Sequence, residues 1–114
     1  MSKYRNIATV YDGERYDSRG EAEYARTLDL QKAVGAITDW RRGTVWTLLP
    51  GARRTDRIEY RPDFEVWDAA GGLRAVDFKG VETPVFKLKA KLWRAVYPDV
   101  ALYVVKADGS ERRV

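Results

Sequence analysis

The chain has 114 residues, of which 45% are hydrophobic and 33% charged, and this predicts a single domain over residues 1–114 with a modest core. It contains no cysteine and no histidine, which excludes disulfides, thiolate metal sites and the commonest general base. Any catalysis must therefore use Asp, Glu, Lys, Arg, Tyr or a metal ion. The net charge of +4 favours a polyanionic partner, although an ordinary basic protein has the same balance.

The sequence contains no segment with the features of a membrane anchor. Residues 1–6 lack the apolar core of a signal peptide, and no run of apolar residues reaches the length of a membrane span. We therefore expect a cytoplasmic protein that has no membrane partner.

Several short strands are expected in the first half of the chain. Residues 7–11 and 15–17 flank a turn at Asp12-Gly13, which predicts a small hairpin. Residues 36–40 and 45–49 follow the first helix and have the same strand-like character. Their two tryptophans could stack on unpaired bases, but core or edge positions are the favoured interpretation.

A capping box predicts the first helix. Ser18 occupies the N-cap position and Glu21 follows three residues later, so the helix should run to about Val34 and stop at Gly35. Glu21 lies in the same stripe of this helix as Leu28. Two roles for Glu21 stay open, which are capping alone or a third acid directed at the site described below.

Residues 50–57 predict a polar, turn-rich loop. It carries three arginines, Arg53, Arg54 and Arg57. Guanidinium groups match phosphate oxygens, so a nuclease would use such a loop to grip a nucleic-acid backbone. A solvated loop in a basic protein is an equally good interpretation for any single arginine.

The most informative stretch is a predicted β-hairpin. Residues 60–67 and 73–80 alternate in polarity, and residues 68–72 between them have turn chemistry. Side chains two residues apart on a strand share a face, so Asp77 and Lys79 should project together. Lys79 then either takes part in catalysis or only forms a salt bridge with Asp77.

Acids on the first strand of this hairpin should face those on the second. Asp63 and Glu65 are both able to lie across from Asp77. Carboxylates and an ammonium group gathered in this way are costly for stability alone and suit a divalent cation and a phosphate. Glu65 stays unsettled, and the favoured interpretation is a surface acid paired with an arginine of a neighbouring strand.

A second helix is predicted from Thr83-Pro84 to Tyr97, where Pro98 stops it. Its predicted apolar arc contains Val85, Phe86, Leu88, Leu92, Trp93, Ala95 and Val96. Lys89 falls inside this arc, so it either extends to the rim or contacts an acid or a phosphate. Lys87, Lys91 and Arg94 fall outside it.

The last predicted strand, residues 100–105, is continuously apolar and suits the interior of a sheet. It must return through a helical crossover, so the order of elements predicts an α/β fold with a mixed central sheet flanked by helices. Residues 112–114 are expected to be a loose tail.

Ordered motifs in this chain resemble those of the PD-(D/E)XK nuclease superfamily. Pro62-Asp63 is followed after thirteen residues by Asp77-Phe78-Lys79, and Glu21 lies on a preceding helix. A narrower similarity is to a small phage and prophage family, formerly of unknown function, that has been likened to Holliday junction resolvases. It rests on four strings, residues 16–24, 61–64, 77–80 and 87–89.

The resemblance implies a restriction-endonuclease-like core, of element order α-β-β-β-α-β, and a metal-dependent DNA endonuclease. By this resemblance Asp63, Asp77 and the backbone carbonyl of Phe78 bind Mg²⁺ or Mn²⁺. Glu21 completes the metal shell directly or through water. Lys79 positions the attacking water, assists its deprotonation or stabilises the transition state. The implied products are a 5′-phosphate and a 3′-hydroxyl.

The implied partner is branched or double-stranded DNA in the cytoplasm of a phage host. Six basic residues are expected to contact it: Lys87, Lys89, Lys91, Arg53, Arg54 and Arg57. Cutting a junction needs two active sites, so a homodimer is expected, with Phe86 and Trp93 as candidates for its surface. A nicking, flap or site-specific nuclease of the same chemistry and a non-catalytic DNA-binding module are the alternatives.

Overall fold

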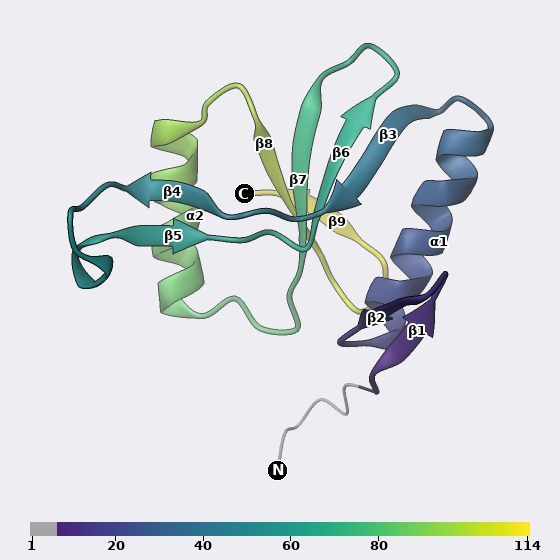
Figure 1. The fold of residues 1–114 in the computed structure, drawn as a ribbon, viewed down its shortest axis with the longest axis horizontal. Helices are drawn as coiled ribbons and strands as arrows, with labels where there is room; N and C mark the ends of the chain where they lie inside the picture. Colours follow the sequence, from purple (N-terminus) through teal and green to yellow (C-terminus); the bar gives the residue numbers. More distant parts are fainter. Residues whose placement is uncertain (1–6) are drawn as a thin grey trace.

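A five-stranded mixed sheet forms the centre of the computed structural model, which describes residues 7–114 (Figure 1). In spatial order its strands are β3 (Ile37–Arg42), β6 (Phe64–Asp68), β7 (Leu73–Phe78), β8 (Ala101–Val105) and β9 (Glu111–Arg113). β7 and β8 are parallel, and the other neighbours are antiparallel. The predicted α/β class with a mixed central sheet is confirmed.

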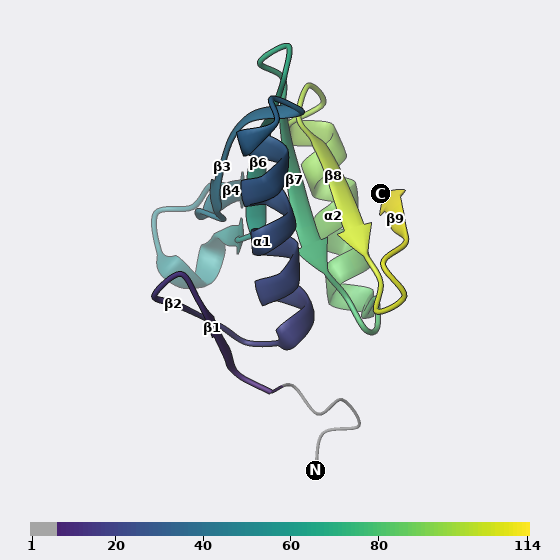
Figure 2. The same cartoon turned by 90° about the vertical axis from the view of Figure 1, so that its right-hand side faces the viewer.

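The two helices cover opposite faces of this sheet (Figure 2). α1 (Arg19–Ala33) packs through Leu28 on a core that contains Phe64, Val66 and Val76. α2 (Pro84–Val96) packs through Trp93 on a second core on the other face. α2 also supplies the crossover that parallel pairing of β7 with β8 requires.

Two small hairpins complete the fold. β1 (Thr9–Tyr11) pairs with β2 (Glu14–Tyr16), as the sequence predicts. β4 (Trp46–Leu49) pairs with β5 (Ile58–Tyr60) beside α2, and a short 3-10 turn, Arg54–Asp56, interrupts the loop between them. No helix within residues 7–114 has the length and apolar character needed to cross a membrane. The expectation about a signal segment in residues 1–6 lies outside the described residues.

Both helices begin where the sequence predicts. The Ser18 hydroxyl accepts a hydrogen bond of 3.1 Å from the backbone N–H of Glu21, and Thr83 accepts one of 3.1 Å from Phe86. Pro84 occupies the first turn of α2, where it removes only a donor that the helix leaves unused. Gly35 follows α1 with a φ of 79°, a left-handed conformation that glycine adopts at little cost.

The strand predicted to begin at residue 60 begins later in the structure, so the prediction is wrong for residues 60–63. Tyr60 belongs to β5 and pairs with Trp46, whereas β6 starts at Phe64. Pro62 has no N–H for a strand ladder, which separates the two strands. At this point the Gly43 N–H donates to the carbonyl of Asp63 over 2.9 Å. The chain therefore changes direction just before the predicted site.

The expectation of a loose C-terminal tail is also wrong. Residues 111–113 form β9, and the N–H of Val114 donates to the carbonyl of Leu102 over 2.9 Å. Gly109 has a φ of 85°, and the N–H of Ser110 donates to Asp108, so this segment forms the turn of a β8–β9 hairpin.

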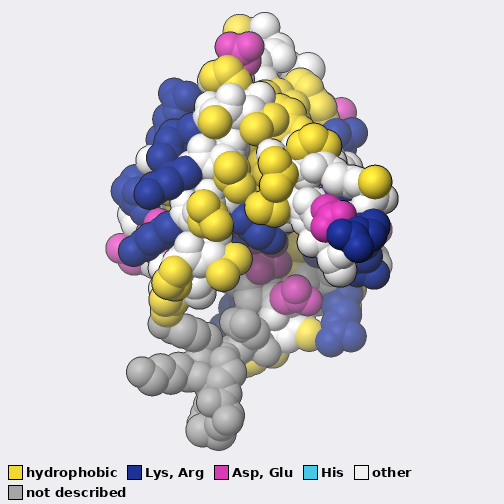
Figure 3. Space-filling view, turned by 90° about the vertical axis from the view of Figure 1, so that its left-hand side faces the viewer, with side chains coloured by type: hydrophobic (Ala, Val, Ile, Leu, Met, Phe, Trp, Pro, Cys, Tyr) yellow, Lys and Arg dark blue, Asp and Glu magenta, His cyan; other side chains and the backbone are white. Residues whose placement is uncertain are grey.

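The predicted apolar arc of α2 is only partly buried. Phe86, Ala90 and Trp93 face the sheet, and Phe86 and Trp93 are too deeply buried to form a dimer surface. The side chains of Val85, Leu88 and Val96 are 63%, 53% and 44% exposed because they lie on the outer side of the helix. Figure 3 shows a stripe of hydrophobic side chains on this face of the molecule, bordered by Lys and Arg.

Gly43 is predicted to be required for the turn that leads to Asp63. A Cβ at residue 43 would overlap the backbone carbonyl of Pro62, which cannot move without displacing the chain. Gly43→Ala should therefore lower the free energy of unfolding by about 3 kcal/mol, or Tm by roughly 10–20 °C. Thermal unfolding followed by circular dichroism would measure this change.

Gly20→Ala is the matched control. Its added Cβ meets only ordinary contacts, the nearest at 3.4 Å from the Phe78 ring, and alanine favours the helix. Equal Tm values for the two variants would contradict the close approach at Gly43.

Candidate active site

A buried carboxylate at the end of β7 is the centre of the candidate site. The side chain of Asp77 is 4% exposed, and its Oδ2 lies 3.0 Å from Nζ of Lys79. The hydroxyl of Tyr60 donates a short hydrogen bond to the same oxygen. Burial and the negative charge of Asp77 raise the pKa of Tyr60, so this phenol stays protonated and keeps donating.

Asp63 lies beside Asp77 in the loop that enters β6. Its Oδ2 accepts a hydrogen bond of 2.7 Å from the backbone N–H of Phe78, which ties the loop to the end of β7. Burial raises the pKa of Asp63 above the ordinary range, and the nearby carboxylates of Asp77 and Glu21 raise it further. The raised pKa favours the protonated form of Asp63 in the absence of a cation.

Glu21 faces the same centre from the first turn of α1. Its backbone N–H is capped by Ser18, which confirms half of the predicted capping box. Burial raises the pKa of its carboxyl group, and the charges of Asp17 and Asp77 add to the effect. Glu21 is therefore both part of the helix start and an acid directed toward Asp77.

The acids fit a metal ion as a pair rather than as a closed cage. Within the described part of the chain, no three acidic side chains are grouped closely enough to enclose an ion. Asp63 and Asp77 would hold a divalent cation, and the remaining positions would be filled by the Phe78 carbonyl and by waters, as Mg²⁺ prefers. Glu21 would act through one of these waters.

Lys79 lies between the acids and an opening to solvent. Its ammonium group is 4.7 Å from the centroid of the Phe86 ring as well as in contact with Asp77. A cavity of about 490 Å³ is lined by Glu21, Phe78 and Lys79 and gives access to this edge of the site. The plain salt bridge expected for Lys79 exists, and its placement also allows contact with an entering ligand.

Glu65 does not belong to the site. It is fully buried, which corrects the expectation of a surface acid, but its predicted partner is confirmed as Arg41 of β3, which donates over 2.9 Å and 2.6 Å. Its other oxygen accepts from Thr44 over 2.5 Å and 2.8 Å and from Trp46 over 3.2 Å. Burial alone would raise the pKa of Glu65, but these hydrogen bonds outweigh it and hold the pKa below the usual value. Both oxygens are occupied by protein donors.

The predicted DNA-contacting residues lie in separate places. Lys87 and Lys91 line a groove between α2 and β9, whereas Lys89 is half-buried elsewhere on α2. The arginine loop, residues 50–57, lies at the far end of the β4–β5 hairpin from the sheet (Figure 1). Arg53 is paired there with Asp56 over 2.9 Å. The loop is thus not brought next to the acids.

The favoured interpretation of the two tryptophans as packing residues is confirmed. Trp40 packs on the α1 core and donates to Asp29 over 2.8 Å. Trp46 lies against Trp93, with ring centroids 4.8 Å apart. Neither is presented for stacking on a base.

Sequence reasoning missed Tyr60 as a member of the site. Its contact with Asp77 depends on β5 crossing the end of β7, which no local pattern reports. Arg112 and Arg113 were also missed because they were expected in a loose tail. The Asp108-Gly109 pair after a long apolar strand is a hairpin signal, and it would have predicted that both arginines lie in an ordered strand.

Comparison with known proteins gives a family but no activity. Residues 1–110 match the family described as "Protein of unknown function (DUF1064)", and the chain therefore belongs to that family. No curated protein and no solved structure matches the chain.

Glu65→Ala is predicted to destabilise the fold without changing the acid pair. Removing this buried carboxylate takes away the acceptor shared by the Arg41, Thr44 and Trp46 donors, which should cost about 2 kcal/mol. Chemical denaturation of the variant would measure the loss. Glu65→Gln keeps an acceptor oxygen and should lose less, and an equal loss in both variants would contradict this account.

The acid pair predicts a pH-dependent stability in the absence of metal. The folded pKa of Asp63 lies above its unfolded value, so the folded protein binds more protons and stability falls as pH rises from about 4 toward neutrality. Asp63→Asn imitates the protonated form and should be more stable than the wild type at about pH 7.5, by at least about 1.4 kcal/mol. The difference should shrink at about pH 4.5.

Urea unfolding in EDTA at both pH values would test this, with the exposed aspartate Asp99 changed to Asn as the control. Parallel pH profiles for wild type and Asp63→Asn would contradict the close placement of the two acids.

Proposed function

We propose that this member of the family is a metal-dependent DNA endonuclease of the PD-(D/E)XK type. The observation that carries the proposal is the convergence of Asp63, Asp77 and Lys79, with Lys79 Nζ 3.0 Å from Asp77 Oδ2. Two neighbouring acids with a lysine beside them suit a hard cation and a phosphodiester better than they suit stability. The chain has no histidine or cysteine to support another hydrolytic chemistry.

The order of elements is compatible with a restriction-endonuclease-like core. If the β4–β5 hairpin is treated as an insertion between β3 and β6, the elements α1, β3, β6, β7, α2 and β8 have the order α-β-β-β-α-β. In this arrangement the candidate acids lie at the start of β6 and the end of β7, where two neighbouring strands of the sheet bring them together. This order supports the proposal, because the acids of the candidate site lie on or next to elements that such a core contains.

The proposed mechanism gives each side chain one task. Asp63 and Asp77 would hold Mg²⁺ or Mn²⁺, and the ion would supply a bound water of lowered pKa and polarise the phosphate. Tyr60 donates to Asp77 and fixes the orientation of that carboxylate. Lys79 stabilises the charge that develops on the phosphate or orients the attacking water. Glu21 orients water at the edge of the site.

The proposed substrate is branched or structured DNA, and the proposed assembly is a homodimer. Two active sites are needed to cut both strands of a junction, and a two-fold dimer would supply them. Phe86 and Trp93 are buried and cannot contact a second subunit, so any dimer uses other residues. The proposed place of action is the cytoplasm of a phage host.

Asp77→Asn is predicted to abolish cleavage and to leave folding and DNA affinity unchanged. The amide keeps the shape of the side chain but loses the charge that holds the cation, so the rate should fall by at least about 10³-fold. Cleavage of labelled four-way junction, flap, duplex and single-stranded DNA, with Mg²⁺, Mn²⁺ or EDTA, would measure it.

Cutting of the junction alone would support a resolvase-like enzyme, and cutting of a flap or of one strand would support the nicking alternative. Full activity in Asp77→Asn would overturn the assignment of the site. Binding without cutting under any metal would favour a non-catalytic DNA-binding module. Asp99→Asn serves as a control for loss of one carboxylate.

A further inference from the structure

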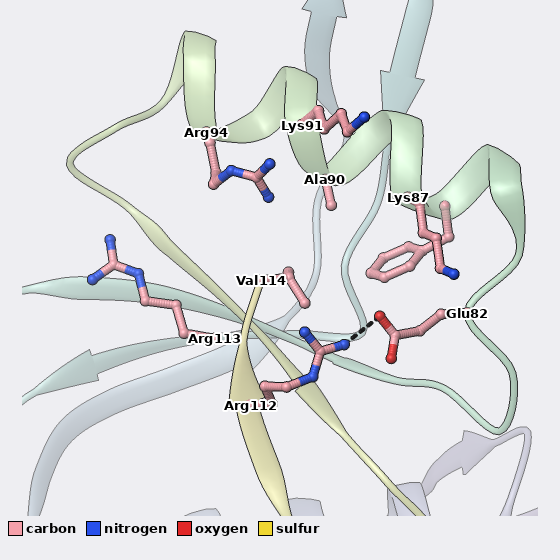
Figure 4. Close-up of a pocket in the computed structure, with 9 residues that line it drawn as sticks. Glu82, Lys87, Ala90, Lys91, Arg94, Arg112, Arg113 and Val114 are labelled. Atoms are coloured by element: carbon pink, nitrogen blue, oxygen red, sulfur yellow. Dashed lines mark hydrogen bonds and ion pairs between the residues drawn. The ribbon is translucent and has the colours of Figure 1, made fainter.

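A groove of about 810 Å³ runs between α2 and β9 on the α2 side of the sheet (Figure 4). Its floor is apolar and includes Phe86, Ala90 and Val114. Its walls carry five cationic side chains: Lys87, Lys91, Arg94, Arg112 and Arg113. The groove thus combines a strongly positive rim with an apolar base.

Most of this positive charge is not neutralised by the protein. Glu82 is the one acidic side chain in the lining, and it pairs with Arg112 and with Lys106 outside the groove. Hydrogen bonds from Arg112 and Lys106 lower the pKa of Glu82 to about 2, so this acid stays charged and bound to them. Within residues 7–114, the other four cations form no salt bridge.

The spacing of the cations follows one side of the helix. Lys87, Lys91 and Arg94 are separated by four and three residues, which places them in a row about 10 Å long. Phosphates of one strand of a duplex follow each other at about 3.4 Å along its axis, so the row spans about three of them. Arg112 and Arg113 form the opposite wall (Figure 4). Two rows facing each other suit an extended polyanion rather than a single ion.

One side chain connects the groove with the candidate active site. The Phe86 ring forms part of the groove lining, and the ammonium group of Lys79 lies over the same ring at 4.7 Å. Lys79 in turn contacts Asp77. The groove therefore lies close to the residues of the candidate site.

We propose that this groove binds the sugar–phosphate backbone of DNA and guides it to the acid pair. The phosphates contact the two rows of cations, and the sugars lie on the apolar floor. The proposal names the path of the substrate and so rests on the proposed nuclease function. Sequence is not read here, because the contacts are to the backbone.

The test measures DNA binding in EDTA, so that it does not depend on catalysis. The double variant Lys91→Ala/Arg94→Ala removes two cations of the groove while alanine keeps the helix. A charge-matched control, Arg26→Ala/Lys32→Ala, removes two exposed cations from α1, on the opposite face of the sheet. Fluorescence anisotropy with labelled duplex at several salt concentrations gives affinity and salt dependence for each protein.

The groove variant should bind at least about tenfold more weakly, and the slope of log K against log salt should flatten by about two. The control should change affinity by less than about twofold. An unchanged slope in the groove variant, with normal binding by wild type, would overturn the groove and leave the nuclease proposal intact. Binding through the groove with no cleavage under any metal would support the groove and contradict the nuclease.

A competition experiment distinguishes binding of a nucleic-acid backbone from binding of inorganic polyphosphate. Tripolyphosphate should displace the duplex only at concentrations far above that of unlabelled DNA, because it cannot occupy both rows. Displacement by tripolyphosphate and by DNA at equal phosphate concentration would overturn the assignment to a nucleic-acid backbone.

Discussion

The burial of the Asp77 carboxylate is the constraint on which the rest of the candidate site depends. A carboxylate that is 4% exposed cannot stay charged without donors, and Tyr60 and Lys79 supply them. Tyr60 comes from β5, which is held beside α2 by the packing of Trp46 on Trp93. The layer outside the central sheet is thus what allows a charged group to exist inside it.

The same layer explains why Glu65 and Asp63 differ although they are two residues apart. The Thr44 and Trp46 donors converge on Glu65, which becomes a structural anion with a lowered pKa. Asp63 is buried with one backbone N–H as donor and with other acids nearby, so its pKa is raised instead. The surroundings and not the residue type therefore decide the direction of the pKa shift.

Sequence patterns predicted the elements whose signals are local and missed the contacts that are not. The caps at Ser18 and Thr83 and the pairing of β6 with β7 follow from short motifs, and the structure has them. The contact of Tyr60 with Asp77 spans seventeen residues and depends on how a second hairpin packs. Periodicity also could not choose which part of the broad apolar arc of α2 faces the sheet, because the arc includes Val85, Leu88 and Val96, which are exposed.

The position of β9 at the edge of the sheet has a consequence for how copies of the chain meet. An edge strand presents backbone donors and acceptors to which another chain can add a strand. All three residues of β9 are exposed and charged, and they oppose such addition by the cost of desolvating them. The arginines at this edge therefore protect the sheet from growing into an aggregate, whatever ligand they contact.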